Sequence, residues 1–288
     1  MKKVLTALAA GALAFGLAAC SDKAEPAPGT SKEKTSDMTA EQVYEKAMEA
    51  SKDMKSAEAK MNISQDIEVP GQDVQMTSDS EFDVQMVLEP LAMHQKGKTS
   101  MKMNDEEMAM DIDMYMTEDG TIYLYTPEAD QWLKMEGMME GLDQLTAQQP
   151  DPEEQLAQLQ QYAKEMKFEQ TDDDYVLKLD ADGEKFNDLV KETMEEQLPP
   201  EMLEGMSEEE RQSLENMNIS DMAYEIHIDK KTYDLKAMNM KMTMTMEAEG
   251  EEMTIAMDMK SVYTNINGIE NIEVPQDVID SAVDIQQQ

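Results

Sequence analysis

The chain has 288 residues, of which 63 are Asp or Glu and 24 are Lys or Arg, and its formal net charge is −39. Such an acidic surface repels phosphate groups, so we expect neither nucleic acid nor anionic lipid headgroups as partners. The single cysteine rules out a disulfide within the chain and leaves no spare catalytic thiol. Acidic runs at 172–174 and 208–210 are typical of a solvated surface, and we assign no metal to them.

The first 19 residues have the pattern of a signal peptide. Lys2 and Lys3 form a positive end, and the apolar stretch 4–19 is too short for a stable membrane-spanning helix. The sequence LAAC that ends at Cys20 matches a lipobox, in which the cysteine sulfur receives a diacylglycerol. The alternative is a cleaved secretory signal with an incidental cysteine. We predict a lipid anchor at Cys20 that holds the protein on the extracytoplasmic face of the membrane.

The composition divides the rest of the chain into a tether and one domain. Residues 20–38 contain the lipidated cysteine and then small residues, prolines and alternating charges without apolar periodicity. This composition predicts a flexible tether. Residues 39–288 form about 250 residues of continuous pattern, which suits a single domain with its own core.

Apolar periodicity predicts a helix followed by an antiparallel meander. Thr39 is a candidate helix cap, and Val43, Ala47, Ala50 and Met54 follow at helical spacing, which predicts a helix over 39–55. From residue 57 the period changes to two. The strands predicted from this alternation cover 57–69, 74–88, 91–103, 108–116, 121–126, 175–179, 217–229, 232–247 and 251–263.

Between the two groups of strands the alternation is lost. Over 127–170, Gln, Leu and Glu recur at helical spacing, and Pro150 and Pro152 mark the start of a helix that runs to about residue 166. A further helix is predicted over 184–197, ending at Pro199-Pro200, and a short one after Ser207. Helices and antiparallel strands in separate blocks indicate an α+β fold.

On both sides of Glu249-Gly250, methionine recurs at alternate positions, at 240, 242, 244 and 246 before it and at 253, 257 and 259 after it. If these two residues form a tight turn, the ladder sets Met246 opposite Met253 and Met242 opposite Met257. The same rule sets Met244 opposite Ile255 and Met240 opposite Met259. Lys, Thr, Glu and Asp then fill most of the other face, so the hairpin has one apolar and one wet side.

A second hairpin repeats this pattern around 104–107. There we expect Met103 opposite Met108 and Met101 opposite Met110, so that the methionine face continues across both hairpins. One interpretation is an ordinary core packed under a helix; the other is a ligand-binding surface. Residue type favours the second, because the flexible thioether of Met adapts to an irregular guest where β-propensity would select Val or Ile.

The sequence also resembles a known family. The N-terminal helix and meander, the stretches YLYTPEADQWLK and EIHIDKKTYDLKAM, and the ending NIEVPQDVID are similar to Gram-positive lipoproteins of the LolA and LppX/LprG-like superfamily, in an uncharacterised branch. The resemblance covers 39–281. It implies a curved antiparallel sheet, a half-barrel of about 9 to 11 strands, partly closed by helices over an apolar cavity for lipid. The methionine content and the acidity depart from the family pattern and leave the ligand open.

Three functions fit these features. The first is a carrier or binding protein for lipid or acyl chains. The second is a copper(I)-binding protein, because soft thioethers favour that ion; Met242, Met244 and Met257 are the candidate ligands. The third is a structural or interaction lipoprotein of the cell envelope whose methionines act as an oxidant sink. The candidate residues for the hydrophobic site are Met101, Met103, Met108, Met110, Met240, Met242, Met244, Met246, Met257, Met259 and Trp132.

An enzyme fits the sequence poorly. There is no G-x-S-x-G, H-E-x-x-H or Gly-rich phosphate loop, and nothing places His94 or His227 beside a nucleophile. We predict a non-enzymatic protein without catalytic residues, cofactor or resident metal. Trp132, the single tryptophan, is interpreted either as an anchor between the sheet and the helical segment or as a residue at a cavity mouth.

Overall fold

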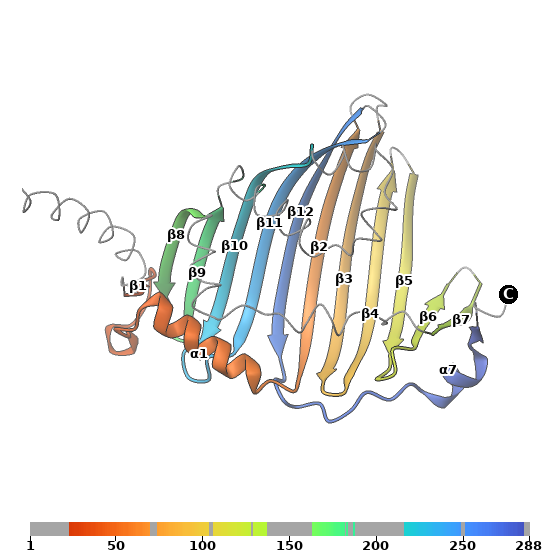
Figure 1. The fold of residues 1–288 in the computed structure, drawn as a ribbon, viewed down its shortest axis with the longest axis horizontal. Coiled ribbons are helices and arrows are strands. Elements are labelled where there is room, and N and C mark those ends of the chain that lie inside the picture. The colour runs from red at the N-terminus through yellow and green to blue at the C-terminus, as the bar shows by residue number, and fades with distance from the viewer. Residues whose placement is uncertain are drawn as a thin grey trace, which may run out of the picture.

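The computed structural model describes residues 23–69, 74–103, 106–127, 129–136, 163–181, 183, 187, 216–248 and 251–284. One sheet of 13 strands dominates it (Figure 1), in the order β1-β8-β9-β10-β11-β12-β2-β3-β4-β5-β6-β7-β13. The outermost pairs at the two edges, β1 with β8 and β13 with β7, are parallel, and the pairs between them are antiparallel. The sheet is therefore mixed. It is open, because the strands at its two ends, β1 and β13, do not pair with each other.

The strands are long in the middle of the sheet and short at its edges. Their bounds are β1 Glu25–Pro26, β2 Ser56–Val69, β3 Val74–Leu88, β4 Leu91–Met103, β5 Glu106–Met116, β6 Ile122–Thr126, β7 Gln131–Met135, β8 Ala163–Gln170, β9 Asp174–Ala181, β10 Asn218–Asp229, β11 Leu235–Ala248, β12 Glu251–Thr264 and β13 Val283–Asp284. Every strand predicted from alternation is present, with ends that differ by a few residues.

The predicted fold class is wrong. We expected an α+β protein with about 9 to 11 strands partly closed by helices. The structure is nearly all-β: its sheet has 13 strands, and the complete helices in the described residues are α1 (Ala40–Lys52), the short α7 (Gln276–Ser281) and a single 3-10 turn, η1 (Lys32–Lys34). The excess strands are β1, β7, β8 and β13, which are too short or too weakly alternating to be recognised from local pattern.

Helix α1 covers one end of the sheet, where the best-defined core lies. Thr39 caps it as predicted: its hydroxyl accepts from the Gln42 amide, and the Gln42 side chain accepts from the Thr39 amide. Figure 1 shows the helix crossing the sheet at the ends of the strands near β9 and β10. Val43, 1% exposed, packs there with Tyr175 of β9 and Ile228 of β10.

The chain beyond β12 follows the same end of the sheet to its far edge (Figure 1) and ends in α7 and β13. Asn267 fixes its start, because its side-chain oxygen accepts from the Lys55 backbone amide at 2.6 Å and its side-chain nitrogen donates to the Asp53 carbonyl at 3.3 Å. Residues 270–272 then line a cavity of about 450 Å³ with Tyr123 and Lys134.

Most of the predicted central helical region lies outside the described residues. This applies to the helices expected over 184–197 and after Ser207, and to most of the helix expected over 150–166; the last four positions of that helix, 163–166, are in strand β8. Within the described ranges, no helix is long and apolar enough to cross a bilayer.

Candidate functional site

The sheet register places every methionine of the described strands on one face. Partners across neighbouring strands point to the same side of a sheet, so the face can be followed from strand to strand. We call this side the methionine face and the opposite side the polar face. The 20 methionines whose side chains the structure describes there are Met61, Met76, Met86, Met93, Met101, Met103, Met108, Met110, Met114, Met116, Met135, Met222, Met238, Met240, Met242, Met244, Met246, Met253, Met257 and Met259.

The register predicted for the β11–β12 hairpin is confirmed. Met246 lies opposite Met253, Met244 opposite Ile255, Met242 opposite Met257 and Met240 opposite Met259. On the other side of β11, Met222 and Tyr224 of β10 continue two of these rows, because they lie opposite Met242 and Met240. Methionines from three neighbouring strands therefore form one patch.

The register predicted for the β4–β5 hairpin is wrong by two residues. Met101 lies opposite Met108, Met103 opposite Glu106, and Met110 opposite Thr99. A shift of two leaves each side chain on its original face, because the side-chain period of a strand is two. The predicted methionines of this hairpin are therefore still on the methionine face, although not in the predicted pairs.

Part of the methionine face is more polar where it crosses β2 and β3. Between Met257 of β12 and Met101 of β4, the row passes through Gln65 of β2 and Ser78 of β3. Two residues further along β3, the Ser80 hydroxyl lies 3.0 Å from the hydroxyl of Thr99 on β4. Another row stays apolar across the same strands, because Ile255 of β12 is followed by Ile67, Met76 and Met103. The methionine areas over β10–β12 and β4–β5 are therefore connected.

The methionine face is only partly sealed. Met222 is 5% exposed and packs with Ile219, Met240, Met242 and Met244, whereas Met103 and Met108 are 51% and 61% exposed. Most other methionines of the face lie between these limits. A sealed core would bury such side chains fully, so the face keeps apolar area in contact with solvent.

Trp132 does not lie with the methionines. It pairs with Tyr125 on the polar face, with ring centroids 5.4 Å apart, and Tyr115 lies 5.9 Å from it. His94 stacks on Tyr115 at 4.0 Å and bonds to Asp113 at 2.9 Å. The alternation of Gln131–Met135 contains the signal for this placement: Leu133 and Met135 point to one side, and Trp132 to the other.

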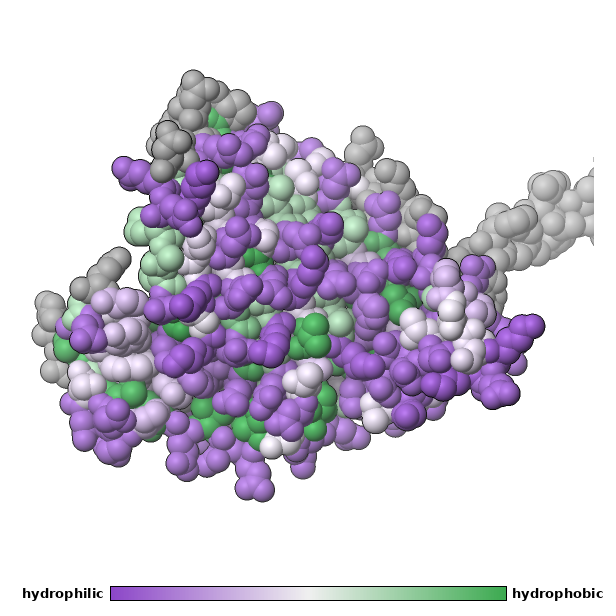
Figure 2. All heavy atoms as spheres, turned by 180° about the vertical axis from the view of Figure 1, so that it is seen from behind, coloured by the Kyte–Doolittle hydropathy of each residue, from purple (hydrophilic) through white to green (hydrophobic). Residues whose placement is uncertain are grey.

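The polar face is hydrophilic over most of its area (Figure 2) and carries an open trough of about 820 Å³. Its lining includes Asp66, Asp79, Asp221, Asp258 and Lys241. In the part of the chain that the structure describes, no three His, Cys, Asp or Glu side chains are grouped as a metal site requires. From the sequence alone, this acidic side is expected only to be a solvated surface.

The second histidine also has a carboxyl partner on the polar face. His227 bonds to Glu225 at 2.8 Å, and this hydrogen bond lowers the pKa of the Glu225 carboxyl. The His94–Asp113 pair lies on strands β4 and β5, far along the sheet order from β10. The prediction of a non-enzymatic protein without cofactor is not tested by these contacts and stays a prediction.

The fold and the face define a class: a nearly all-β protein with an open sheet, one side of which is rich in methionine. The chain belongs to the family of unknown function DUF6612, whose model matches residues 39–283. No curated protein matches it in sequence.

Two solved structures are similar over most of their length. A beta-barrel-like protein of the domain of unknown function DUF1849 from Brucella abortus is 9% identical, with a TM-score of 0.21, and the match covers 73% of this chain and 99% of that one. A DUF1329 family protein from Desulfovibrio piger is 11% identical, with a TM-score of 0.22, and the match covers 80% and 96%. Because both TM-scores are low, no inference about ligand or function rests on these similarities.

Proposed function

We propose that the protein is a membrane-anchored, extracytoplasmic lipoprotein that binds the acyl chain of a lipid, or another hydrophobic ligand, on its methionine face. One observation carries this proposal: the 20 strand methionines with described side chains share one face, and most remain partly exposed. An exposed apolar area of this kind, on a protein of net charge −39, is typical of a ligand-binding or interaction site.

The residue type supports an acyl chain as the guest. Met has an unbranched, polarizable side chain that fills irregular space, so a surface built from it tolerates chains of different length and kink. An acyl chain is held by buried area and offers few polar groups to recognise. The similarity of the sequence to LolA and LppX/LprG-like lipoproteins supports the same ligand class.

The lipobox at Cys20 supports the anchor and the location on the outer face of a Gram-positive membrane. Cys20 lies outside the described residues, so this part of the proposal rests on sequence. Labelling cells with a radioactive fatty acid tests it: the wild-type protein should be labelled, and a Cys20→Ser variant should not. Equal labelling of both proteins would refute lipidation at Cys20.

Native mass spectrometry tests the ligand. The chain from residue 20 onward, purified from a bacterium, should carry extractable lipid and should bind an apolar fluorophore saturably. Absence of both would remove the proposed function.

A copper(I) site is the second candidate, because Met222, Met242 and Met257 lie directly opposite one another on three neighbouring strands. Partners in an antiparallel ladder have Cβ atoms about 5 Å apart, so three flexible thioethers in one row can converge on one ion. The function as an oxidant sink stays a prediction.

A further inference from the structure

The segment 23–38, expected as part of a flexible tether, lies against the sheet edge. Glu25 and Pro26 form β1 and pair in parallel with Glu169 and Gln170 at the end of β8. The Ala27 amide donates to the Gln170 carbonyl at 2.8 Å, and Ala24 is 4% exposed in the core cluster under α1. Both the backbone and the side chains of this segment therefore contact the domain.

Gln170 connects both ends of the segment. It is 1% exposed, and its side-chain amide donates to the Ala24 carbonyl at 2.6 Å and to the Ser36 carbonyl at 3.1 Å. Its side-chain oxygen accepts from the Ser36 amide at 2.8 Å. One buried side chain thus closes residues 24–36 into a loop and holds that loop on β8.

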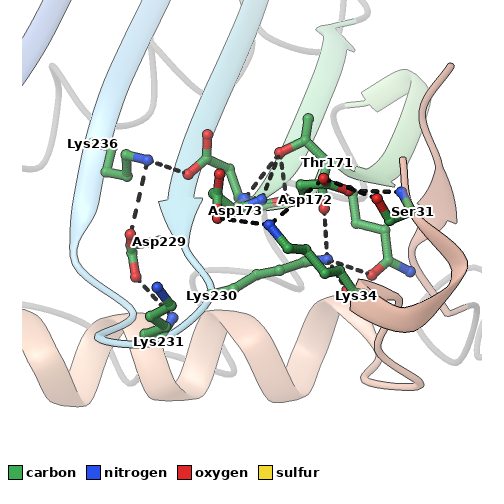
Figure 3. Close-up of polar contacts among 11 residues, drawn as sticks. Ser31, Lys34, Thr171, Asp172, Asp173, Asp229, Lys230, Lys231 and Lys236 are labelled. Atoms are coloured by element: carbon green, nitrogen blue, oxygen red, sulfur yellow. Dashed lines mark hydrogen bonds and ion pairs between the residues drawn. The ribbon is translucent and has the colours of Figure 1, made fainter. Parts of the chain in front are cut away.

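Lys230 adds a second point of attachment (Figure 3). Its ammonium donates to the carbonyls of Lys34 and Thr171, at 2.8 and 2.7 Å, and to the Gln170 side-chain oxygen at 2.8 Å. All three protons of the ammonium therefore have an acceptor. Burial lowers the pKa of Lys230. The turn between β10 and β11 is linked in this way to β8 and to the N-terminal segment.

Asp172 holds the middle of the segment. Its carboxylate accepts from the Ser31 amide at 2.7 Å and from the Ser31 hydroxyl at 3.1 Å (Figure 3). Lys34 lies 3.6 Å from both Asp172 and Asp173. The contacts of Gln170, Lys230 and Asp172 together fix the segment from Ala24 to Ser36.

We propose that this docked segment orients the domain on the membrane, with the β1–β8 edge facing the bilayer and the sheet standing edge-on. The inference rests on the proposed anchor at Cys20. Three peptide steps separate Cys20 from Lys23, so the Cα atoms of these two residues are at most about 10 Å apart. A free tether of 20–38 would allow any side of the domain to approach the membrane; the docked segment presents only one edge.

The charge of this edge suits such an approach. Residues 23–39 contain three lysines and three acidic residues, Lys23, Lys32, Lys34, Glu25, Glu33 and Asp37, and are neutral in sum, whereas the whole chain carries −39. The docked segment therefore adds no net negative charge to the edge that faces the headgroups.

Trp132 provides a built-in reporter of this orientation. It lies on β7, eleven strand spacings from β1 across the sheet. At about 4.8 Å per spacing this is about 50 Å, so an edge-on sheet keeps the only tryptophan of the chain far from the lipids. A domain that rotates freely on a tether brings Trp132 close to the membrane surface for part of the time.

The experiment measures energy transfer from Trp132 to dansyl-labelled lipid headgroups. The chain from residue 20 is coupled through its single thiol, Cys20, to a maleimide phospholipid in phosphatidylcholine vesicles. The reference is a variant in which residues 24–38 are replaced by Gly and Ser at equal length. Lys230→Met removes the three hydrogen bonds, and Lys231→Met is the matched control, because the neighbouring Lys231 side chain is exposed. Thermal denaturation verifies that each variant is folded.

We expect low transfer for the wild-type protein and Lys231→Met, and clearly higher transfer for the Gly/Ser variant and Lys230→Met. Equal transfer for the wild-type protein and the Gly/Ser variant would overturn the proposed orientation. Equal transfer for Lys230→Met and Lys231→Met would overturn the role of Lys230. The coupling is chemical, so failure of natural lipidation or of ligand binding appears only in the labelling and native mass spectrometry experiments.

Discussion

Met242 of β11 lies directly opposite Met257 of β12, and both are partly exposed on the methionine face. The next pair along the same two strands is Thr243 and Ala256, whose side chains point to the polar face. The two sides of one hairpin thus carry different chemistry at adjacent positions. This allows the two faces to be altered separately by neighbouring substitutions.

Changing Met242 and Met257 together to Thr should weaken both folding and binding of apolar ligands. A hydroxyl placed without a partner in apolar surroundings costs about 1 to 3 kcal/mol, and the partial exposure of both sites places the expected loss near 1 kcal/mol each. Chemical denaturation and titration with an apolar fluorophore measure the two effects. Ala256→Thr on the opposite face is the control and should leave fluorophore binding unchanged. Parent-like stability and binding in the double variant would show that this face is neither core nor ligand site.

Changing Met222, Met242 and Met257 together to Leu should separate lipid binding from copper binding. Leu keeps similar volume and apolar character, so we expect a cost below about 1.5 kcal/mol per site and retention of lipid. Copper(I) needs the sulfur lone pairs, and competition with a chromophoric chelator under reducing conditions detects their loss. The matched control changes Met101, Met103 and Met108 to Leu on β4 and β5. The second candidate would replace the proposed function under two conditions. The parent protein would carry no lipid and bind copper(I) tightly, and only the variant with Met222, Met242 and Met257 changed to Leu would lose that binding.

Gly97→Ala should destabilise the protein. Gly97 of β4 lies opposite Phe82 of β3, and a methyl group at this position would overlap the Glu81 carbonyl oxygen and contact the Phe82 ring. The obstacle is backbone and cannot rotate away, so we expect a loss of about 1 to 3 kcal/mol in the free energy of unfolding. Ser100→Ala, on the same strand, should change it by less than about 0.5 kcal/mol. Equal denaturation midpoints for the two variants would contradict this account of Gly97.

The attachment of Ser31 should weaken in acid. The hydrogen bond from the Ser31 amide, aided by the Ser31 hydroxyl and Lys34, lowers the pKa of Asp172 below its ordinary value of 3.8. A depressed carboxyl pKa stabilises the docked segment above that ordinary value, and the stabilisation is lost as the pH falls through the lowered pKa. NMR of the Ser31 amide should therefore show a titration below pH 3.8. Asp172→Asn, which keeps an acceptor oxygen but cannot titrate, should abolish it; a midpoint at or above 3.8 would contradict the assignment.

Local sequence determined much of the sheet. Alternation located the long strands, the turn predicted from the sequence at 249–250 led to the correct register of β11 with β12, and Thr39 marked the start of α1. These features depend on residues close in sequence: strand period, turn chemistry and helix capping. They were sufficient to place the methionines on one face, including those of the β4–β5 hairpin, whose register was predicted two residues from the observed one.

Only the tertiary structure decided the features that depend on distant partners. A shift of two residues preserves both faces, so apolar pattern cannot select between the two registers of β4 with β5. β1 and β13 have two residues each and exist because β8 and β7 offer them a free edge. Residues 23–38 have the composition of a tether, yet they dock because Gln170, Lys230 and Asp172, between 130 and 200 residues away, satisfy their polar groups. Composition reports how much apolar area a segment can bury by itself, whereas docking depends on hydrogen-bond partners that only the folded sheet brings together.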